Sequence, residues 1–324
     1  MKFRTEIENI LLRTHIGYGN HILSLGSCFA DEMARRLTAA KFHITANPTG
    51  VLFNPHTVAD ALRSFERGQM LTAASLHEEQ GVWFDYNFHG SFSAESPAAA
   101  LKKMNAAIAT GHQALAEADR VLLTFGTAWV YELVATGTVV ANCHRQPQSL
   151  FTRRRLTVEQ IVAEWSALFS TLLADKEIIL TVSPVRHLGD SLIGNTLSKA
   201  TLLLAAEALT KAYPNVSYFP AYELLTDDLR DYRFYADDLV HPAPQAVDYI
   251  WEKFCTSALS DHTRHLLTQV EALVTATHHR PTHPNSTAYR LFCQKMSNSI
   301  VSLEQATEGD FSEEKEHFTA VLSK

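Results

Sequence analysis

The 324-residue sequence has little cysteine, and its four cysteines form no short-spaced pair. Disulfide frameworks and structural zinc sites need cysteines at close, repeated spacings such as C-x-x-C, so the sequence argues against both. We therefore expect free thiols in a reducing compartment, at Cys28, Cys143, Cys255 and Cys293. Because Cys143-His144 has no second pair at metal-ligand spacing, we expect no bound metal.

Positive charge and long apolar runs are also scarce. The chain has 28 Lys and Arg against 35 Asp and Glu, for a formal net charge of -7. Nucleic acids and anionic membranes select basic surfaces, so neither is expected as a partner. No apolar stretch reaches 18 residues, and the first residues contain no signal-peptide core. We expect a soluble, cytoplasmic protein without a cofactor.

Short apolar runs alternate with amphipathic helical patterns along most of the chain, which is typical of a parallel sheet with crossover helices. The expected strands are 21–25, 42–46, 120–126, 177–183 and 216–222; the main expected helices are 29–40, 56–67, 97–117, 157–174, 195–212 and 246–259. Residues 129–142 are expected to form a small hairpin. We predict an α/β domain over residues 1–258 and a helical C-terminal extension over 259–324, packed on it and broken at 278–284.

The turn Gly26-Ser27-Cys28 follows the first expected strand and opens the first expected helix. A nucleophile at such a turn is exposed above the sheet, and the helix N-terminus favours a thiolate or a developing oxyanion. The alternative is an ordinary N-cap, in which Ser27 satisfies helical N–H groups and Cys28 is a small buried residue. The turn alone favours the N-cap.

A second candidate is Asp238-Leu239-Val240-His241, ahead of Pro242. An aspartate three residues before a histidine can accept the imidazole Nδ1–H, which leaves Nε2 free as a general base. The alternative is a loop Asp that makes an Asx turn before a helix. Asp237 is one residue too far from the histidine for the same turn.

A third candidate is Phe125-Gly126-Thr127-Ala128-Trp129, where an expected strand ends in small residues. Such a turn can point backbone N–H groups, here those of Gly126 and Thr127, at a bound anion. A turn that only starts the following hairpin explains the residues equally well.

Several sequence segments together resemble the GSCFA-domain family, a branch of the SGNH (GDSL-like) hydrolases. They are GSCFA (26–30), FGTAWVY (125–131), NCHRQP (142–147), TVSPVRH (181–187), SK (198–199), YFPAYE (218–223) and DYRFYADDLVHP (231–242). The resemblance runs from about residue 20 to beyond residue 280. It implies a three-layer α/β/α fold with a flavodoxin-like parallel sheet and a hydrolase or acyltransferase ancestry.

The resemblance also implies roles for individual residues. The first SGNH block is Gly-Asp-Ser, so alignment on Gly26 makes Cys28 the nucleophile, whereas alignment on the serine selects Ser27. The oxyanion glycine of the second block matches Gly50, and the final Asp-x-x-His block matches Asp238 and His241. The third block, Gly-x-Asn-Asp, lacks its oxyanion asparagine at Ala128, a loss of about 3 kcal/mol of transition-state stabilisation. Candidate replacements are Asn54, Asn142 and His144.

A Cys-His-Asp constellation suits attack on an ester or thioester through a covalent acyl-enzyme. We expect a nearby imidazolium and the helix N-terminus to lower the pKa of Cys28. The expected partner is a small-molecule or carbohydrate-linked acyl substrate. Alternatives are a non-catalytic SGNH-like module that binds a small molecule or carbohydrate, and a redox sensor in which Cys28 is merely oxidised.

Other polar residues at strand ends are candidates for lining a pocket. Arg186 and His187 follow an expected strand, and an arginine there can clamp a carboxylate or phosphate. His89 lies in an aromatic loop over residues 81–93 and can touch substrate, although a structural role is the simpler interpretation. Lys199 lies on an expected helix, where a pocket position is as open as a solvated face or a salt bridge.

Overall fold

The computed structural model describes residues 4–323, and its centre is a five-stranded parallel sheet. The strand order is β10-β9-β5-β1-β2, so the five strands, counted along the chain, have the order 2-1-3-4-5 of flavodoxin-like sheets. Their bounds are β1 His21–Gly26, β2 His43–Ala46, β5 Arg120–Phe125, β9 Glu177–Val182 and β10 Val216–Phe219. The α/β fold and the flavodoxin-like sheet predicted from the sequence are confirmed.

After their first residues, the central strands are largely apolar because both faces of the sheet are covered. In β1, β5 and β9, every residue after the first is buried. Such runs are typical of parallel strands between two helical layers. The strand predicted over 216–222 ends earlier, at Phe219, because Pro220 interrupts it and residues Ala221–Glu223 form the short helix α6.

Two helical layers cover the sheet. On one face, α1 (Cys28–Ala39) and α7 (Pro244–Ala258) pack over Ile22, Leu122 and Ile179. On the other, α2 (Pro55–Arg67), α3 (Pro97–Glu117), α4 (Val158–Ser170) and α5 (Ser191–Ala212) pack over side chains that include Leu23, Leu123 and Leu180. Alternate residues of these strands therefore face opposite layers, as the pleat requires.

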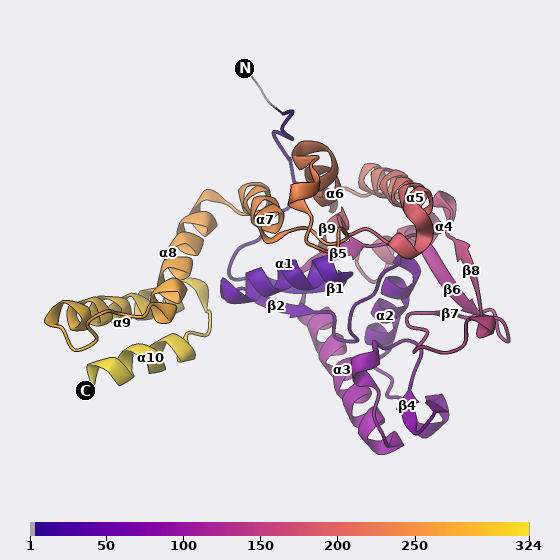
Figure 1. Ribbon diagram of the computed structural model, residues 1–324, viewed down its shortest axis with the longest axis horizontal. Coiled ribbons are helices and arrows are strands. Elements are labelled where there is room, and N and C mark those ends of the chain that lie inside the picture. The colour runs from indigo at the N-terminus through magenta and orange to yellow at the C-terminus, as the bar shows by residue number, and fades with distance from the viewer. Residues whose placement is uncertain (1–3, 324) are drawn as a thin grey trace.

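Two small β elements lie beside the main sheet. The strands β3 (His77–Glu79) and β4 (Val82–Phe84) form a hairpin in the aromatic loop. The predicted hairpin over 129–142 consists of β6 (Trp129–Leu133) and β7 (Val139–Val140), but a third strand, β8 (Phe151–Arg155), pairs with β6 as well. Figure 1 shows these strands at one side of the molecule.

The C-terminal part is helical, as predicted. It comprises α8 (Asp261–His278), α9 (Thr287–Thr307) and α10 (Ser312–Leu322), and the predicted break at 278–284 separates α8 from α9. Figure 1 shows these helices together on the opposite side of the molecule from β6–β8. The ion pair between Lys41 Nζ and Glu314 Oε1, at 2.8 Å, ties α10 to the loop before β2. A domain boundary at residue 258 stays a prediction.

Residues 4–323 contain no helix that combines the length and the hydropathy needed to span a membrane.

Candidate active site

The candidate site lies where the strand order reverses, at the carboxyl ends of β1 and β5. Ligands of open α/β sheets bind at this crevice. Gly26 ends β1 with φ +145°, and a Cβ there would stand 2.2 Å from the carbonyl oxygen of Thr124. Its N–H donates to Asn47 Oδ1 at 2.8 Å, which joins β1 to the turn around Gly50. Only glycine fits this position.

The two candidate nucleophiles have different surroundings. Ser27 is 2% exposed, and its Oγ accepts a hydrogen bond from Phe29 N at 3.4 Å, which is the N-cap arrangement that the sequence allowed. Cys28, the first residue of α1, is half-buried. It lines a cavity of about 310 Å³ together with His241. The side chain that shares a cavity with the histidine is therefore the thiol.

The pKa of the Cys28 thiol departs from the sequence-based expectation. Burial raises it, and the nearby Asp31 carboxylate raises it further, while the backbone N–H of Cys28 acts in the lowering direction. The expected lowering by the helix N-terminus is thus outweighed, and that prediction was wrong. The thiol is predominantly protonated at neutral pH, so a nucleophilic role requires a base.

Asp238 and His241 form a closed turn. Asp238 Oδ2 lies 2.7 Å from His241 Nδ1, and Oδ1 accepts hydrogen bonds from the N–H groups of Val240 (2.9 Å) and His241 (3.0 Å). These hydrogen bonds, with the His241 N–H first, lower the pKa of Asp238 to about 2. Asp238 therefore has both roles: Oδ1 makes the Asx turn, and Oδ2 orients the imidazole of His241. Nδ1 is the donor to a carboxylate, so Nε2 is the acceptor.

Arg186 braces this turn. The backbone N–H of Arg186 donates to Val240 O at 3.1 Å, and its side-chain Nη1 lies 3.5 Å from Leu239 O. The guanidinium stands over the rings of Tyr235 and Tyr232, 4.0 and 5.1 Å from their centroids. The side chain that the sequence suggested as a substrate clamp thus contacts the protein's own loop.

The backbone donors expected to bind an anion are engaged within the protein. The N–H groups of Gly126 and Thr127 both donate to Phe53 O at 2.8 Å, and Gly50 N–H donates to Asn47 O at 2.7 Å. Gly50 has φ +89°, and a Cβ there would stand 2.2 Å from His89 Cβ. These glycines fix close backbone approaches in this structure.

Asn54 is the replacement candidate nearest to the third-block turn. It follows Phe53, whose carbonyl accepts from Gly126 and Thr127. Its Oδ1 caps α2 by accepting from Thr57 N at 2.9 Å. Within residues 4–323, no acceptor takes a hydrogen bond from its Nδ2. The side-chain amide of Asn54 is therefore held by its Oδ1, and its Nδ2 is left as a hydrogen-bond donor.

His187 also belongs to this region. Its Nε2 is buried without a hydrogen-bond partner among the described residues. Nε2 and the Cβ of Ser27 both lie within about 3.3 Å of the point where a Cβ on Gly126 would stand. Burial, followed by the positive charges of Lys199 and Arg153 and by His241, lowers the pKa of His187 to about 4. The imidazole is therefore neutral at pH 7.

Lys199 is buried behind the same turn, so its solvated interpretation was wrong. Its Nζ donates to Gly126 O and to Ser183 O, each at 2.6 Å, and so joins the ends of β5 and β9. The side chain is fully buried, and burial lowers its pKa to about 7. Nothing in the sequence pattern separates this lysine from a surface one.

A pH-dependent stability difference is expected from Lys199. The unfolded chain keeps this proton up to about pH 10.4, whereas the folded chain releases it near 7, so unfolding takes up a proton between these values. The contribution of Lys199 to the free energy of unfolding therefore rises with pH, by up to about 1.4 kcal/mol per pH unit. The free energy of unfolding, measured in urea, should rise for wild type relative to Lys199→Met as the pH increases from 7 to 10. A difference in unfolding free energy that stays constant over this pH range contradicts the prediction. The control is Lys211→Met, because Lys211 is an exposed lysine of the same helix.

The remaining candidates lie around a second cavity, of about 780 Å³. His144 Nε2 lies 2.9 Å from Asp85 O, and its ring stacks on Phe84 at 4.4 Å. Asn142 Oδ1 accepts from the His144 N–H at 2.8 Å. His89 lines the same cavity and contacts Gly50 from the other side. Only His89 thus touches a residue of the Gly26 crevice.

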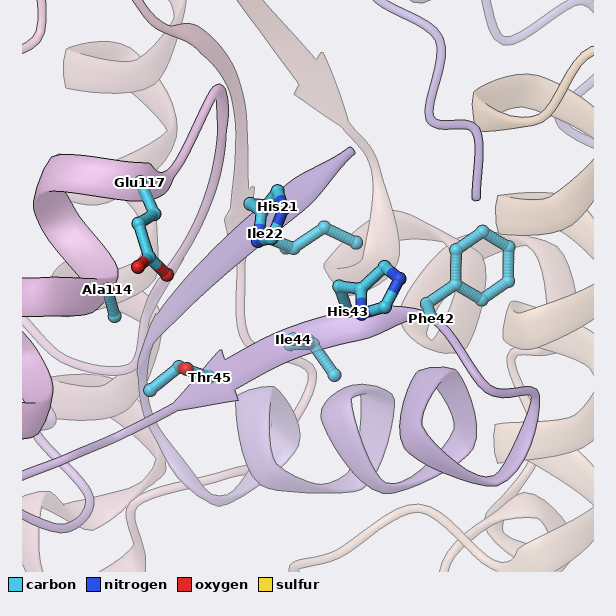
Figure 2. Close-up of a pocket in the computed structure, with 8 residues that line it drawn as sticks. All are labelled: His21, Ile22, Phe42, His43, Ile44, Thr45, Ala114 and Glu117. Carbon is cyan, nitrogen blue, oxygen red and sulfur yellow. The ribbon is translucent and has the colours of Figure 1, made fainter. Parts of the chain in front are cut away.

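Two further clusters were missed from the sequence. His56, Asp60 and Glu164 lie close enough to share a cation, but Arg63 Nη1 already stands 2.8 Å from a carboxylate oxygen of each acid. At the amino ends of β1 and β2, the rings of His21 and His43 stack at 5.3 Å beside a cavity of about 350 Å³ (Figure 2). Neither cluster lines the cavity beside Cys28.

Comparison with known proteins gives the family. The pattern of the GSCFA family matches residues 21–254, and that of the GSCFA domain protein C-terminal domain matches residues 270–324. A solved structure from Streptococcus pneumoniae, described provisionally as a platelet activating factor, has 13% identity and a TM-score of 0.36 over 72% of this chain and 83% of its own. No curated protein sequence matches. Because the family pattern spans most of the chain, this protein belongs to the GSCFA family.

Proposed function

We propose that this protein transfers an acyl group from an ester or thioester to water or an alcohol, with Cys28 as nucleophile, His241 as base and Asp238 as its orienting partner. The observation that carries the proposal is that Cys28 and His241 line one cavity while Asp238 holds His241 Nδ1 at 2.7 Å. The SGNH relationship predicted from the sequence agrees with this assignment and stays a prediction.

The chemistry follows from the protonation states. Because the Cys28 thiol is protonated at rest, His241 Nε2 takes its proton as the sulfur attacks the acyl carbonyl carbon. The tetrahedral intermediate then breaks its bond to the leaving oxygen or sulfur, to which His241 returns the proton. Water or an alcohol, deprotonated by His241, then attacks the carbonyl carbon of the acyl-enzyme thioester. Cys28 leaves as the thiol, with the proton that His241 returns to its sulfur. Asp238 stabilises the imidazolium in both halves.

The oxyanion needs donors other than those expected from the sequence. The N–H of Cys28 stands at the N-terminus of α1, where backbone donors lack intrahelical acceptors. The Nδ2 of Asn54 is the proposed side-chain donor, in place of the asparagine missing at Ala128. A preorganised donor of this kind contributes about 10²–10³-fold to kcat.

Turnover of a panel of p-nitrophenyl esters and acyl thioesters tests the proposal. Hydrolysis is expected, together with its loss after treatment with iodoacetamide and in the His241→Ala variant. His144→Ala, at the second cavity, is the matched control and should keep activity within about threefold. Turnover that survives both iodoacetamide and His241→Ala would refute the assignment.

The alternative is a non-catalytic module that binds an acyl compound or a carbohydrate. It is favoured by the internal hydrogen bonds of Gly50, Gly126 and Thr127, which occupy the backbone donors that an SGNH hydrolase would use. This alternative predicts saturable binding of ester-panel members by calorimetry with no turnover, and binding that is unaffected by Cys28→Ala.

A further inference from the structure

The cavity beside Cys28 has mostly apolar walls. Apart from Cys28 and His241, its apolar lining comes from Phe29 of α1, Val185 after β9, and Pro242, Pro244 and Val247 at the start of α7. It therefore lies between the N-terminal ends of two helices on the same face of the sheet. An apolar group in this space would leave water and contact these side chains.

The charged residues at this cavity neutralise one another. Glu32 accepts hydrogen bonds from Arg35 at 2.6 Å and from Arg36 at 3.2 Å, and Arg36 also donates to Asp248 at 2.6 Å. Two guanidinium groups thus face two carboxylates. An anionic ligand would have to break one of these pairs, so the cavity offers no uncompensated charge to a charged group.

We propose that this cavity holds the acyl chain of the substrate and that the chain is apolar and short, with about four to eight carbons. The inference rests on the proposed function of Cys28. The length follows from the volume: 310 Å³ is at the lower end of ligand cavities and equals roughly ten groups the size of a water molecule, part of which the reacting carbonyl takes. The polar carrier of the acyl group then lies outside this cavity.

Val247, a buried residue of α7 that lines this cavity, gives the test, because a larger or smaller side chain there changes the room for the acyl chain. In a series of p-nitrophenyl esters from C2 to C12, kcat/KM of wild type should rise about fourfold per methylene up to about C8 and then fall. Val247→Phe should move the maximum to C2–C4 and lower C8 turnover at least tenfold. Val247→Ala should move it to longer chains. Val301→Phe, an exposed valine on α9, is the control and should keep the wild-type profile.

A second measurement uses n-alkyl chloromethyl ketones of the same chain lengths, which alkylate a thiol without turnover. The rate of Cys28 labelling, followed by intact mass, should show the same maxima in wild type and in both Val247 variants. If the labelling rate does not depend on chain length, or depends on it identically in wild type and both variants, the proposal that this cavity holds the acyl chain is refuted. If that happens while Cys28→Ala abolishes turnover, the proposed function survives; if Cys28→Ala keeps turnover, the proposed function itself has failed.

Discussion

Replacing Cys28 with alanine is expected to lower kcat/KM for the best ester or thioester by at least about a thousandfold. The variant loses the atom that forms the acyl-enzyme, so only binding and the oxyanion donors remain to accelerate attack by water. Because Cys28 is half-buried at the first position of α1, alanine fits there and the fold should persist. Steady-state kinetics, with circular dichroism as the folding check, measure the effect.

The matched variant is Ser27→Ala. Ser27 caps α1, so its loss should cost about 1 kcal/mol of unfolding free energy and leave kcat/KM within about tenfold of wild type. The reverse outcome, in which Ser27→Ala abolishes turnover and Cys28→Ala does not, would move the nucleophile to Ser27. It would also mean that a side chain only 2% exposed becomes accessible during the reaction.

Replacing Gly26 with alanine is expected to cost at least about 4 kcal/mol of unfolding free energy. An added Cβ would stand 2.2 Å from Thr124 O on the neighbouring strand, and φ +145° is a backbone conformation that other residues rarely adopt. Neither β1 nor β5 can move aside, because both are buried at the centre of the sheet. Urea unfolding followed by circular dichroism, or failure to recover folded protein, reports the loss.

Gly81→Ala separates the two contributions to this loss. Gly81 has φ +81° but nothing within 4 Å of an added Cβ, so its replacement should cost only about 1 kcal/mol, from backbone strain. Equal costs at Gly26 and Gly81 would contradict the close approach to Thr124.

The sheet and the edge that carries the candidate site follow from local sequence patterns. Apolar runs such as residues 120–125 read as buried parallel strands, and chain order then places Gly26 and Gly126 at neighbouring strand ends. The Asp238-x-x-His241 contact is also local, because the two side chains lie three residues apart. For these features, near neighbours in the sequence are near neighbours in space.

What the sequence missed depends on long-range contacts. The residues FTRRR of β8 carry no apolar alternation and form a strand only because β6 pairs with them. Lys199 has the character of a surface residue until two carbonyls from different strand ends enclose it. The direction of the Cys28 pKa shift depends on burial in the folded chain and on Asp31, and neither effect can be weighed from the helix N-terminus alone.

Detection of the acyl-enzyme tests the central claim most directly. Wild-type protein is mixed with its best p-nitrophenyl ester, quenched in acid within the first turnovers, and analysed by intact mass and peptide mapping. We expect one acyl group per chain, on the peptide that contains Cys28, at the sulfur of that residue and removable by neutral hydroxylamine. An acyl group on Ser27 or on another cysteine, or hydrolysis with no adduct and no burst of product, would contradict the account.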